Sequence, residues 1–175
     1  VPQHQVVAVS GAEAFPLDGR ELRIIPAQGH APHHMAIYDS KSQGLFCGEA
    51  LGSFRPGFDT VIPGVAPPSF DMELALETMK RIRELSPQIL FFSHQGVSRD
   101  VGRLIDKAEQ QTKAFGDLVL RAMKNGASEA QISQMLVRYL EQNSSSPEIL
   151  KETQGQKWMM VTQGYEVYFK KKNLV

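Results

Sequence analysis

Three residues whose side chains commonly bind metal ions lie far apart in the sequence, each in a loop that follows an apolar, strand-like run. His30, Glu49 and His94 are separated by 19 and then 45 residues, spacings that match no local metal-binding motif such as HExxH. Imidazole and carboxylate groups together suit zinc, iron or manganese. Side chains at strand ends can converge on one edge of a sheet. The alternative is a turn histidine, a surface carboxylate and a loop histidine with no common role.

The strands that would position these residues are expected mainly in the first 50 residues. Apolar runs separated by Gly-, Pro- and Asp-containing turns occur at residues 6–9, 22–25, 35–38 and 45–47. Because short strands follow one another directly, we predict an antiparallel meander. The segment 52–70 is rich in proline and glycine, which predicts a long loop, and long loops in compact domains are often functional.

A helix and a buried strand are predicted next. Apolar residues recur every three or four positions across 72–85, and Ser86-Pro87 ends this pattern. The continuous apolar run 89–92 is typical of a strand buried on both faces, and His94 follows it. The order predicts a helix, a strand, and a histidine at the carboxyl end of that strand.

Helices are predicted to make up the remainder of the chain. One long apolar face extends over residues 104–123 and stops near Asn125-Gly126. Ser128, with Gln131 three residues later, forms a capping-box pattern that predicts the start of a second helix. The stretch 155–175 is apolar and then basic, a pattern compatible with a helix or a strand, and we favour a final helix.

Four segments in a fixed order resemble a known family. They are GHAPHHMAIYD, LFCGEALG, PPSFDMELALETMKRIREL and ILFFSHQG, all within the first 101 residues. The series resembles the C-terminal half of a metallo-β-lactamase-fold hydrolase of the glyoxalase II-like branch, whose matching motifs are TPGHTPGH, a strand ending in GD, a proline-rich loop, a helix, and a strand ending in SHG or THG. The resemblance implies an α/β fold: half of an αββα sandwich over residues 1–101, followed by a helical accessory region over 102–175.

The resemblance also implies roles for single residues. His30 corresponds to the third histidine ligand of the first metal, His94 to the last histidine ligand of the second, and Glu49 to the aspartate that bridges both. His34 corresponds to a histidine that supports the ligands without binding metal, whereas His33 replaces a glycine and inherits no role. The implied cofactor is a pair of divalent metal ions, zinc foremost, with iron and manganese as alternatives.

Two departures from the family pattern bear on activity. Glu49 is one methylene longer than the usual aspartate, so bridging two metals requires a changed geometry. The HxHxDH motif, which the family carries in the N-terminal half of the domain, does not occur in this sequence. We therefore expect the sequence to be a fragment of a longer protein. Its inner sheet face would be covered by the missing N-terminal half or, in a homodimer, by a second copy.

The implied reaction is hydrolysis of an ester, a thioester or a lactone by metal-activated water, without a side-chain nucleophile. The 175-residue chain alone is expected to be inactive because its ligand set is incomplete. Two alternatives stay open. One is a non-catalytic fragment or binding module that retains the fold, and the other is an iron-dependent oxidative enzyme on the same fold.

The loop after Glu49 offers candidates for a substrate pocket. These are Arg55, Phe58, Asp59 and Phe70. Arginine and aromatic side chains in a long loop can line a pocket, but they can equally pack the loop against the rest of the protein. Both interpretations stay open on the sequence alone.

The charge composition of the chain limits the kinds of molecule that it is expected to bind. The 19 basic and 19 acidic side chains cancel, so no overall field favours nucleic acid or an anionic membrane, and we expect a small-molecule substrate. The single cysteine, Cys47, lies between apolar neighbours, which predicts a buried, unreactive thiol and a reducing, cytoplasmic location. No run approaches the ~18 apolar residues that a membrane span requires.

Overall fold

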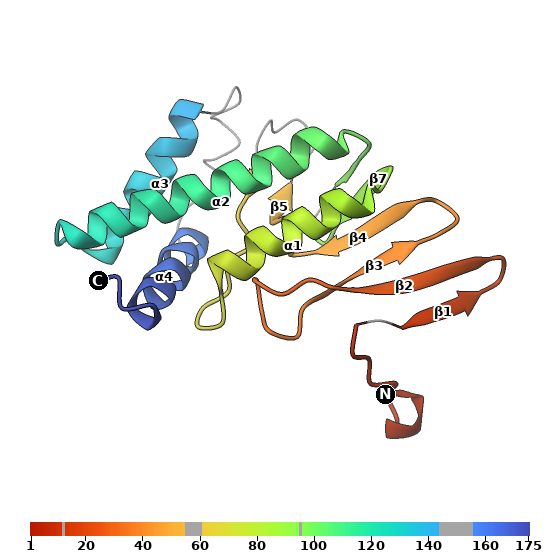
Figure 1. The fold of residues 1–175 in the computed structure, drawn as a ribbon. Helices are drawn as coiled ribbons and strands as arrows, with labels where there is room; N and C mark the ends of the chain where they lie inside the picture. Colours follow the sequence, from red (N-terminus) through yellow and green to blue (C-terminus); the bar gives the residue numbers. More distant parts are fainter. Residues whose placement is uncertain (12, 55–60, 95, 144–155) are drawn as a thin grey trace.

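A six-stranded sheet in the order β1-β2-β3-β4-β7-β8 forms the centre of the fold. The computed structural model describes residues 1–175 except for 12, 55–60, 95 and 144–155 (Figure 1). The strands of this sheet are β1 Ala14–Leu17, β2 Arg20–Pro26, β3 Met35–Asp39, β4 Gly44–Gly48, β7 Ile89–Phe92 and β8 Val97–Ser98. A separate pair of short strands consists of β5 Ser53–Phe54 and β6 Val61–Ile62.

Strand pairing confirms the predicted meander and adds one parallel neighbour. Strands β1 to β4 pair antiparallel in sequence order, each with its neighbour along the chain. Strand β7 then pairs parallel with β4, with Leu45 opposite Leu90. Because parallel neighbours cannot be joined by a tight turn, the chain between them must cross over the sheet. Helix α1, Met72–Leu85, lies within that crossover, so the predicted α/β class is correct.

The strand predicted at residues 6–9 is wrong. Val6 and Val7 are exposed, and the chain before them forms the short 3-10 helix η1, Gln3–Gln5. The first strand is β1, which pairs with β2 through a turn at Asp18 and Gly19, both with positive φ. An Asp-Gly pair between strand-like segments is a strong hairpin signal. The Asp18-Gly19 pair, and not the apolar run at 6–9, therefore indicates the edge strand of the sheet, β1.

Helix α1 occupies the range that its apolar periodicity predicts. The Asp71 side chain caps its first turn by accepting a hydrogen bond from the Leu74 backbone N–H at 3.1 Å. Ser86 ends the helix in the left-handed conformation, with φ 53°. The buried face carries Met79 and Ile82, which pack with Leu45 and Leu90 of the sheet.

Three longer helices follow and confirm the predicted helical region. They are α2 Val101–Lys124, α3 Glu129–Asn143 and α4 Gln156–Lys171. The capping box is present: the Ser128 N–H donates to Gln131 Oε1 at 2.8 Å, and the Gln131 N–H donates to Ser128 Oγ at 3.4 Å. In the part of the chain that the structure describes, no helix is long and apolar enough to cross a lipid bilayer.

The protein has two hydrophobic cores, one beneath the sheet and one among the last three helices, and helix α2 contributes to each. Its first half, including Leu104 and Ile105, packs with α1 and the sheet. Its second half, including Phe115, joins Trp158 and Tyr165 in a core formed mainly by α2, α3 and α4. Tyr165 is fully buried and donates its hydroxyl to the Thr112 carbonyl at 2.9 Å. The helical region is therefore packed continuously with the sheet region through one helix.

Helices α1 and α2 cover one face of the large sheet and run across that face in Figure 1. The opposite face carries apolar side chains that stay accessible. Phe46 is 46 % exposed and stacks on Phe91 at 4.6 Å between ring centroids. Met35 and Val97, at either side, are 40 % and 59 % exposed. A row of exposed apolar side chains of this kind is typical of a surface that another element covers.

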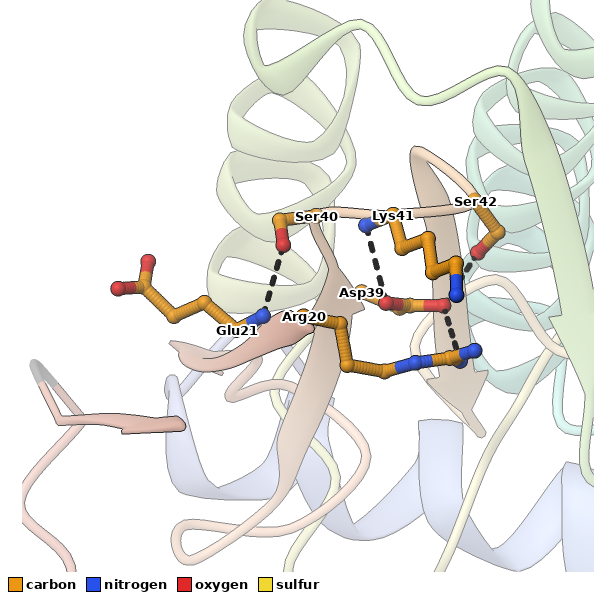
Figure 2. A network of polar contacts seen from close by, with 6 residues as sticks. All are labelled: Arg20, Glu21, Asp39, Ser40, Lys41 and Ser42. Atoms are coloured by element: carbon orange, nitrogen blue, oxygen red, sulfur yellow. Dashed lines mark hydrogen bonds and ion pairs between the residues drawn. The ribbon is translucent and has the colours of Figure 1, made fainter. Parts of the chain in front are cut away.

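The turn from β3 to β4 is built around a buried carboxylate (Figure 2). Asp39 is 2 % exposed and accepts hydrogen bonds from Arg20 Nη1 at 2.9 Å, Ser42 Oγ at 2.6 Å and the Lys41 backbone N–H at 3.1 Å. The hydrogen bond from Ser42 is the main reason why the pKa of Asp39 lies below its ordinary value. Both carboxylate oxygens are therefore matched with donors.

Candidate metal site

The topology brings the three candidate ligands to one edge of the sheet. Glu49 follows β4 and His94 follows β7, and these two strands are parallel neighbours. His30 lies in the loop that enters β3, which is antiparallel to β4 and so starts at the same edge. All three side chains line a single pocket of about 740 Å³. The Asp39 turn lies at the other end of the β3–β4 hairpin.

Glu49 has an unusual environment for a carboxylate. Its side chain is 18 % exposed, and Oε1 lies 2.6 Å from His94 Nε2. The angle between these two groups does not suit a hydrogen bond, so the buried Oε1 atom of Glu49 has no hydrogen-bond partner. Buried polar atoms nearly always have a partner, because leaving one unsatisfied costs free energy. A cation in the pocket would satisfy this oxygen.

His34 holds the backbone of Glu49. Its Nδ1 bonds to the Ala27 carbonyl at 3.0 Å, and its Nε2 accepts the Glu49 backbone N–H at 2.9 Å. A ring that donates from Nδ1 and accepts at Nε2 is neutral, and burial lowers the pKa of His34 accordingly. Both nitrogens are engaged, which leaves no lone pair for a metal. The role of support that the resemblance implies for His34 is compatible with this geometry.

Gly48 makes the approach of His34 feasible. Its φ is +55°, and a Cβ at this position would lie 2.4 Å from His34 Nε2. Only glycine combines that backbone conformation with the close contact. The bend also shifts the register between β4 and β7 next to the site, so Glu49 leaves the strand as the ladder becomes irregular.

His30 presents a free ring nitrogen. Its Nδ1 lies 3.2 Å from the Gly64 carbonyl oxygen, and in the neutral ring a hydrogen bond to that oxygen places the proton on Nδ1 and the lone pair on Nε2. Histidine ligands commonly donate from one nitrogen to a carbonyl and bind metal with the other. The tautomer of His30 therefore suits a ligand.

The donor types fit a metal site, but the set is incomplete. Among the residues that the structure describes, no group of three or more His, Cys, Asp or Glu side chains is arranged to hold a metal ion. Glu49 and His94 are in contact, and His30 faces the same pocket. A complete centre requires donors beyond these residues, and the assignment of the three ligands stays a prediction.

The other predicted pocket residues separate into two groups. Arg55, Phe58 and Asp59 lie outside the described residues. Phe70 is 3 % exposed and packs edge-on against Tyr165 at 4.9 Å between ring centroids, so it belongs to the helical core and not to the pocket wall. Phe70 is a loop-packing residue because its ring lies where the loop meets α4.

Cys47 and His33 carry no chemistry in this arrangement. Cys47 is fully buried beside Glu49, and burial raises the pKa of its thiol to about 12. Nucleophilic cysteines require the thiolate, so Cys47 is unreactive, as predicted. His33 is exposed and lies outside the pocket that contains His30.

Sequence reasoning missed the contribution of α4 to the pocket. Lys157, Met160 and Val161 line it, although they lie more than 60 residues beyond His94. Their neighbour Trp158 is 2 % exposed and lies in the helical core, as expected for an apolar stripe. No local pattern marks Lys157, because its place depends on how α4 packs.

The chain belongs to the metallo-beta-lactamase superfamily, whose sequence profile matches residues 1–94. One similar protein is the metallo-beta-lactamase fold-containing protein ST1585 of Sulfurisphaera tokodaii, 36 % identical over 95 residues. That alignment covers 54 % of this chain and 34 % of ST1585. The chain therefore spans about a third of the length of this curated relative.

Solved structures agree on the fold. The crystal structure of ST1585 from Sulfolobus tokodaii matches with a TM-score of 0.54 and 33 % identity, over 66 % of this chain and 41 % of that one. The metallo-beta-lactamase family protein TTHA1429 from Thermus thermophilus matches with a TM-score of 0.65 and 18 % identity, over 94 % and 49 %. At that identity the second match concerns the fold alone. It extends into the helical region.

Proposed function

We propose that this chain is the C-terminal half of a metal-dependent hydrolase of the glyoxalase II-like branch, acting on an ester, a thioester or a lactone. His30, Glu49 and His94 would be metal ligands, zinc being the foremost candidate. The observation that carries the proposal is the buried Oε1 of Glu49, which accepts no hydrogen bond and lies 2.6 Å from His94 Nε2 in a pocket that His30 also lines. A metal held by these donors would give that oxygen a partner.

The exposed sheet face supports the proposal that residues 1–101 are half of a larger domain. Phe46, Met35 and Val97 are too accessible for a sheet that is covered on both faces. The similar structures are about twice as long as the parts of them that this chain matches. A preceding segment carrying HxHxDH would cover this face and complete the ligand set. Residues 102–175 would then form the accessory region that closes the pocket.

The roles of the chain's own residues follow from their contacts. Metal ions at this site would supply Lewis acidity and an activated water. His34 keeps Glu49 in place by accepting its backbone N–H, and the Gly64 carbonyl orients the His30 ring. Val65 and Val161 also line the pocket and provide an apolar surface that would exclude water from a bound acyl group. With one buried cysteine of high pKa, we propose a reducing, cytoplasmic setting.

Metal content of the full gene product tests the ligand assignment. We expect about two equivalents of divalent metal in the wild-type protein, as in two-metal hydrolases. His30→Ala, Glu49→Gln and His94→Ala should each lower the metal content measured by elemental analysis. His33→Ala is the matched control because His33 is exposed and outside the pocket. Unchanged metal in all three ligand variants would refute the assignment.

A second candidate function is a non-catalytic binding module that keeps the fold. One observation favours it: among the described residues, no three metal-binding side chains are arranged closely enough to hold a metal ion. The measurement of metal content distinguishes the two candidate functions. A full gene product that copurifies with no metal and binds none on addition would support the module and exclude the hydrolase.

A further inference from the structure

The ring of His30 is oriented by a segment of the chain that lies far from it in the sequence. Its Nδ1 lies 3.2 Å from the carbonyl oxygen of Gly64, in the segment 63–66 that follows β6. The backbone beside His30 is held separately by α1, because the Gly29 carbonyl accepts the Asp71 N–H at 2.8 Å. Rotation of the ring is the freedom that remains. The contact with the Gly64 carbonyl therefore decides which way the ring points.

Helix α4 contacts the same segment one residue further on, at Val65. Val65 is 7 % exposed and belongs to the helical core together with Phe70 and Tyr165. A Cβ at Gly164 of α4 would lie 2.1 Å from Val65 Cγ1, so a residue without a side chain is needed for this approach. The valine side chain is branched at Cβ and has little freedom to turn away. The contact between Gly164 and Val65 therefore fixes how close the segment 63–66 lies to α4.

Helix α4 is itself held by two other helices. The Thr162 and Ser133 hydroxyls form a buried hydrogen bond at 2.9 Å, which joins α4 to α3. The Tyr165 hydroxyl donates to the Thr112 carbonyl of α2 at 2.9 Å. A closely packed interior transmits a local displacement because it has few voids to absorb it. A change in the spacing between α4 and Val65 should therefore move the segment 63–66, and with it the Gly64 carbonyl.

We propose that α4 positions the His30 ring through Val65 and the Gly64 carbonyl, with Gly164 as the positioning residue in this series of contacts. A hydrogen bond to the carbonyl keeps the proton of the neutral ring on Nδ1 and leaves Nε2 available to a metal. The helical region thus holds one ligand in the tautomer that binds metal. The inference rests on the proposed function for the role of His30 as a ligand, but the tautomer is a property of the metal-free protein.

The tautomer of His30 in the metal-free full gene product tests the proposal, measured from long-range proton–nitrogen NMR spectra of the imidazole rings. The wild-type ring should carry its proton on Nδ1, and His30→Gln identifies its signals. Gly164→Ala displaces Val65, and Val65→Ala leaves a gap beside Gly164, so each should give a mixture of the two tautomers. The double variant returns a methyl group to that gap and should restore the single tautomer.

Gly116→Ala is the matched control, because Gly116 is also buried within a helix of this region. The nearest neighbours of a Cβ there would be Met72 Sδ at 2.6 Å and Tyr165 Cε1 at 3.5 Å. The substitution should change the free energy of unfolding and leave the His30 tautomer unchanged. A single tautomer that persists in both Gly164→Ala and Val65→Ala, or an equal change in Gly116→Ala, would overturn the proposal. Since Val65→Ala adds no atoms, it keeps the test decisive if Gly164→Ala does not fold.

Zinc affinity of the full gene product, measured by competition with a chelating dye, connects the tautomer to the proposed function. Loss of the outer contacts of a metal-binding histidine weakens metal binding, so Gly164→Ala should lower the affinity about tenfold and the double variant should recover it. Unchanged affinity in Gly164→Ala would contradict the positioning role. A wild-type protein that binds no zinc would instead refute the hydrolase assignment, and the tautomer measurement would still decide whether α4 positions His30.

Discussion

Two carboxylates, the buried Asp39 and the partly buried Glu49, lie at opposite ends of the β3–β4 hairpin, and their surroundings differ. Asp39 accepts hydrogen bonds from an arginine, a serine and a backbone N–H (Figure 2). Glu49 has a buried oxygen without a partner and a misaligned histidine 2.6 Å away. A carboxylate with all its partners within the chain stabilises the fold. One that lacks them is available for a ligand.

The largest effect that would test this contrast is expected at Gly48. Gly48→Ala places a Cβ 2.4 Å from His34 Nε2, and both nitrogens of that ring are already bonded, so the ring cannot move without losing a contact. With the positive φ, we expect a loss of about 3 kcal/mol in the free energy of unfolding. Urea denaturation of the full gene product measures it.

Gly19→Ala at the opposite end of the sheet is the matched control. Gly19 has φ +75°, but no atom lies within 4 Å of the Cβ it would acquire. The substitution should cost about 1 kcal/mol, from backbone strain alone. Equal losses at Gly48 and Gly19 would mean that the His34 contact contributes nothing.

Removing the charge of each carboxylate should have unequal effects on stability. Asp39→Asn leaves Arg20 without its buried partner and removes an acceptor from Ser42, so Tm should fall by several degrees. Glu49→Gln in the metal-free protein removes a buried charge that lacks a hydrogen bond, and Tm should stay the same or rise. Scanning calorimetry of both variants without metal would contradict the comparison if Glu49→Gln were the more harmful.

The pH dependence of stability should report Asp39. Its pKa is lowered in the folded protein, chiefly by Ser42, so the unfolded chain binds the proton more tightly. The stabilisation is fully present above the ordinary aspartate pKa of about 4 and is lost as the pH falls through the folded value. The difference in urea midpoint between wild type and Asp39→Asn should therefore shrink below about pH 4. A difference that is constant down to pH 2 would exclude Asp39 as its source.

The smallest effect is expected for an exposed arginine–carboxylate pair. Arg83 Nη2 lies 2.7 Å from Asp106 Oδ1, closer than Arg20 lies to Asp39, but the Asp106 side chain is 68 % exposed. Solvent weakens such pairs, so Asp106→Asn should change the free energy of unfolding by no more than about 0.5 kcal/mol. Urea denaturation in low salt measures it. A loss as large as that of Asp39→Asn would show that distance matters more than burial.

Much of the secondary structure could be predicted from local patterns. The helix at 72–85, the strand at 89–92 and the Ser128 capping box occur where periodicity and capping place them. The error at 6–9 came from treating an apolar run as a strand without asking which neighbour would pair with it. Strand pairing is a non-local property, and β2 pairs instead with the segment joined to it by Asp18-Gly19.

The sequence by itself determined the donor types, the helices, the strands at 22–25, 35–38, 45–47 and 89–92, and the family. These depend on residue identity and on interactions within a few positions of the chain. Only the tertiary structure decided that Glu49 lacks a partner while Asp39 has several, and that Lys157 faces the pocket while Phe70 does not. The physical reason is that hydrogen-bond satisfaction and pocket lining depend on the approach of α4 and the strand ends, which are distant in sequence. Local patterns carry no measure of that approach.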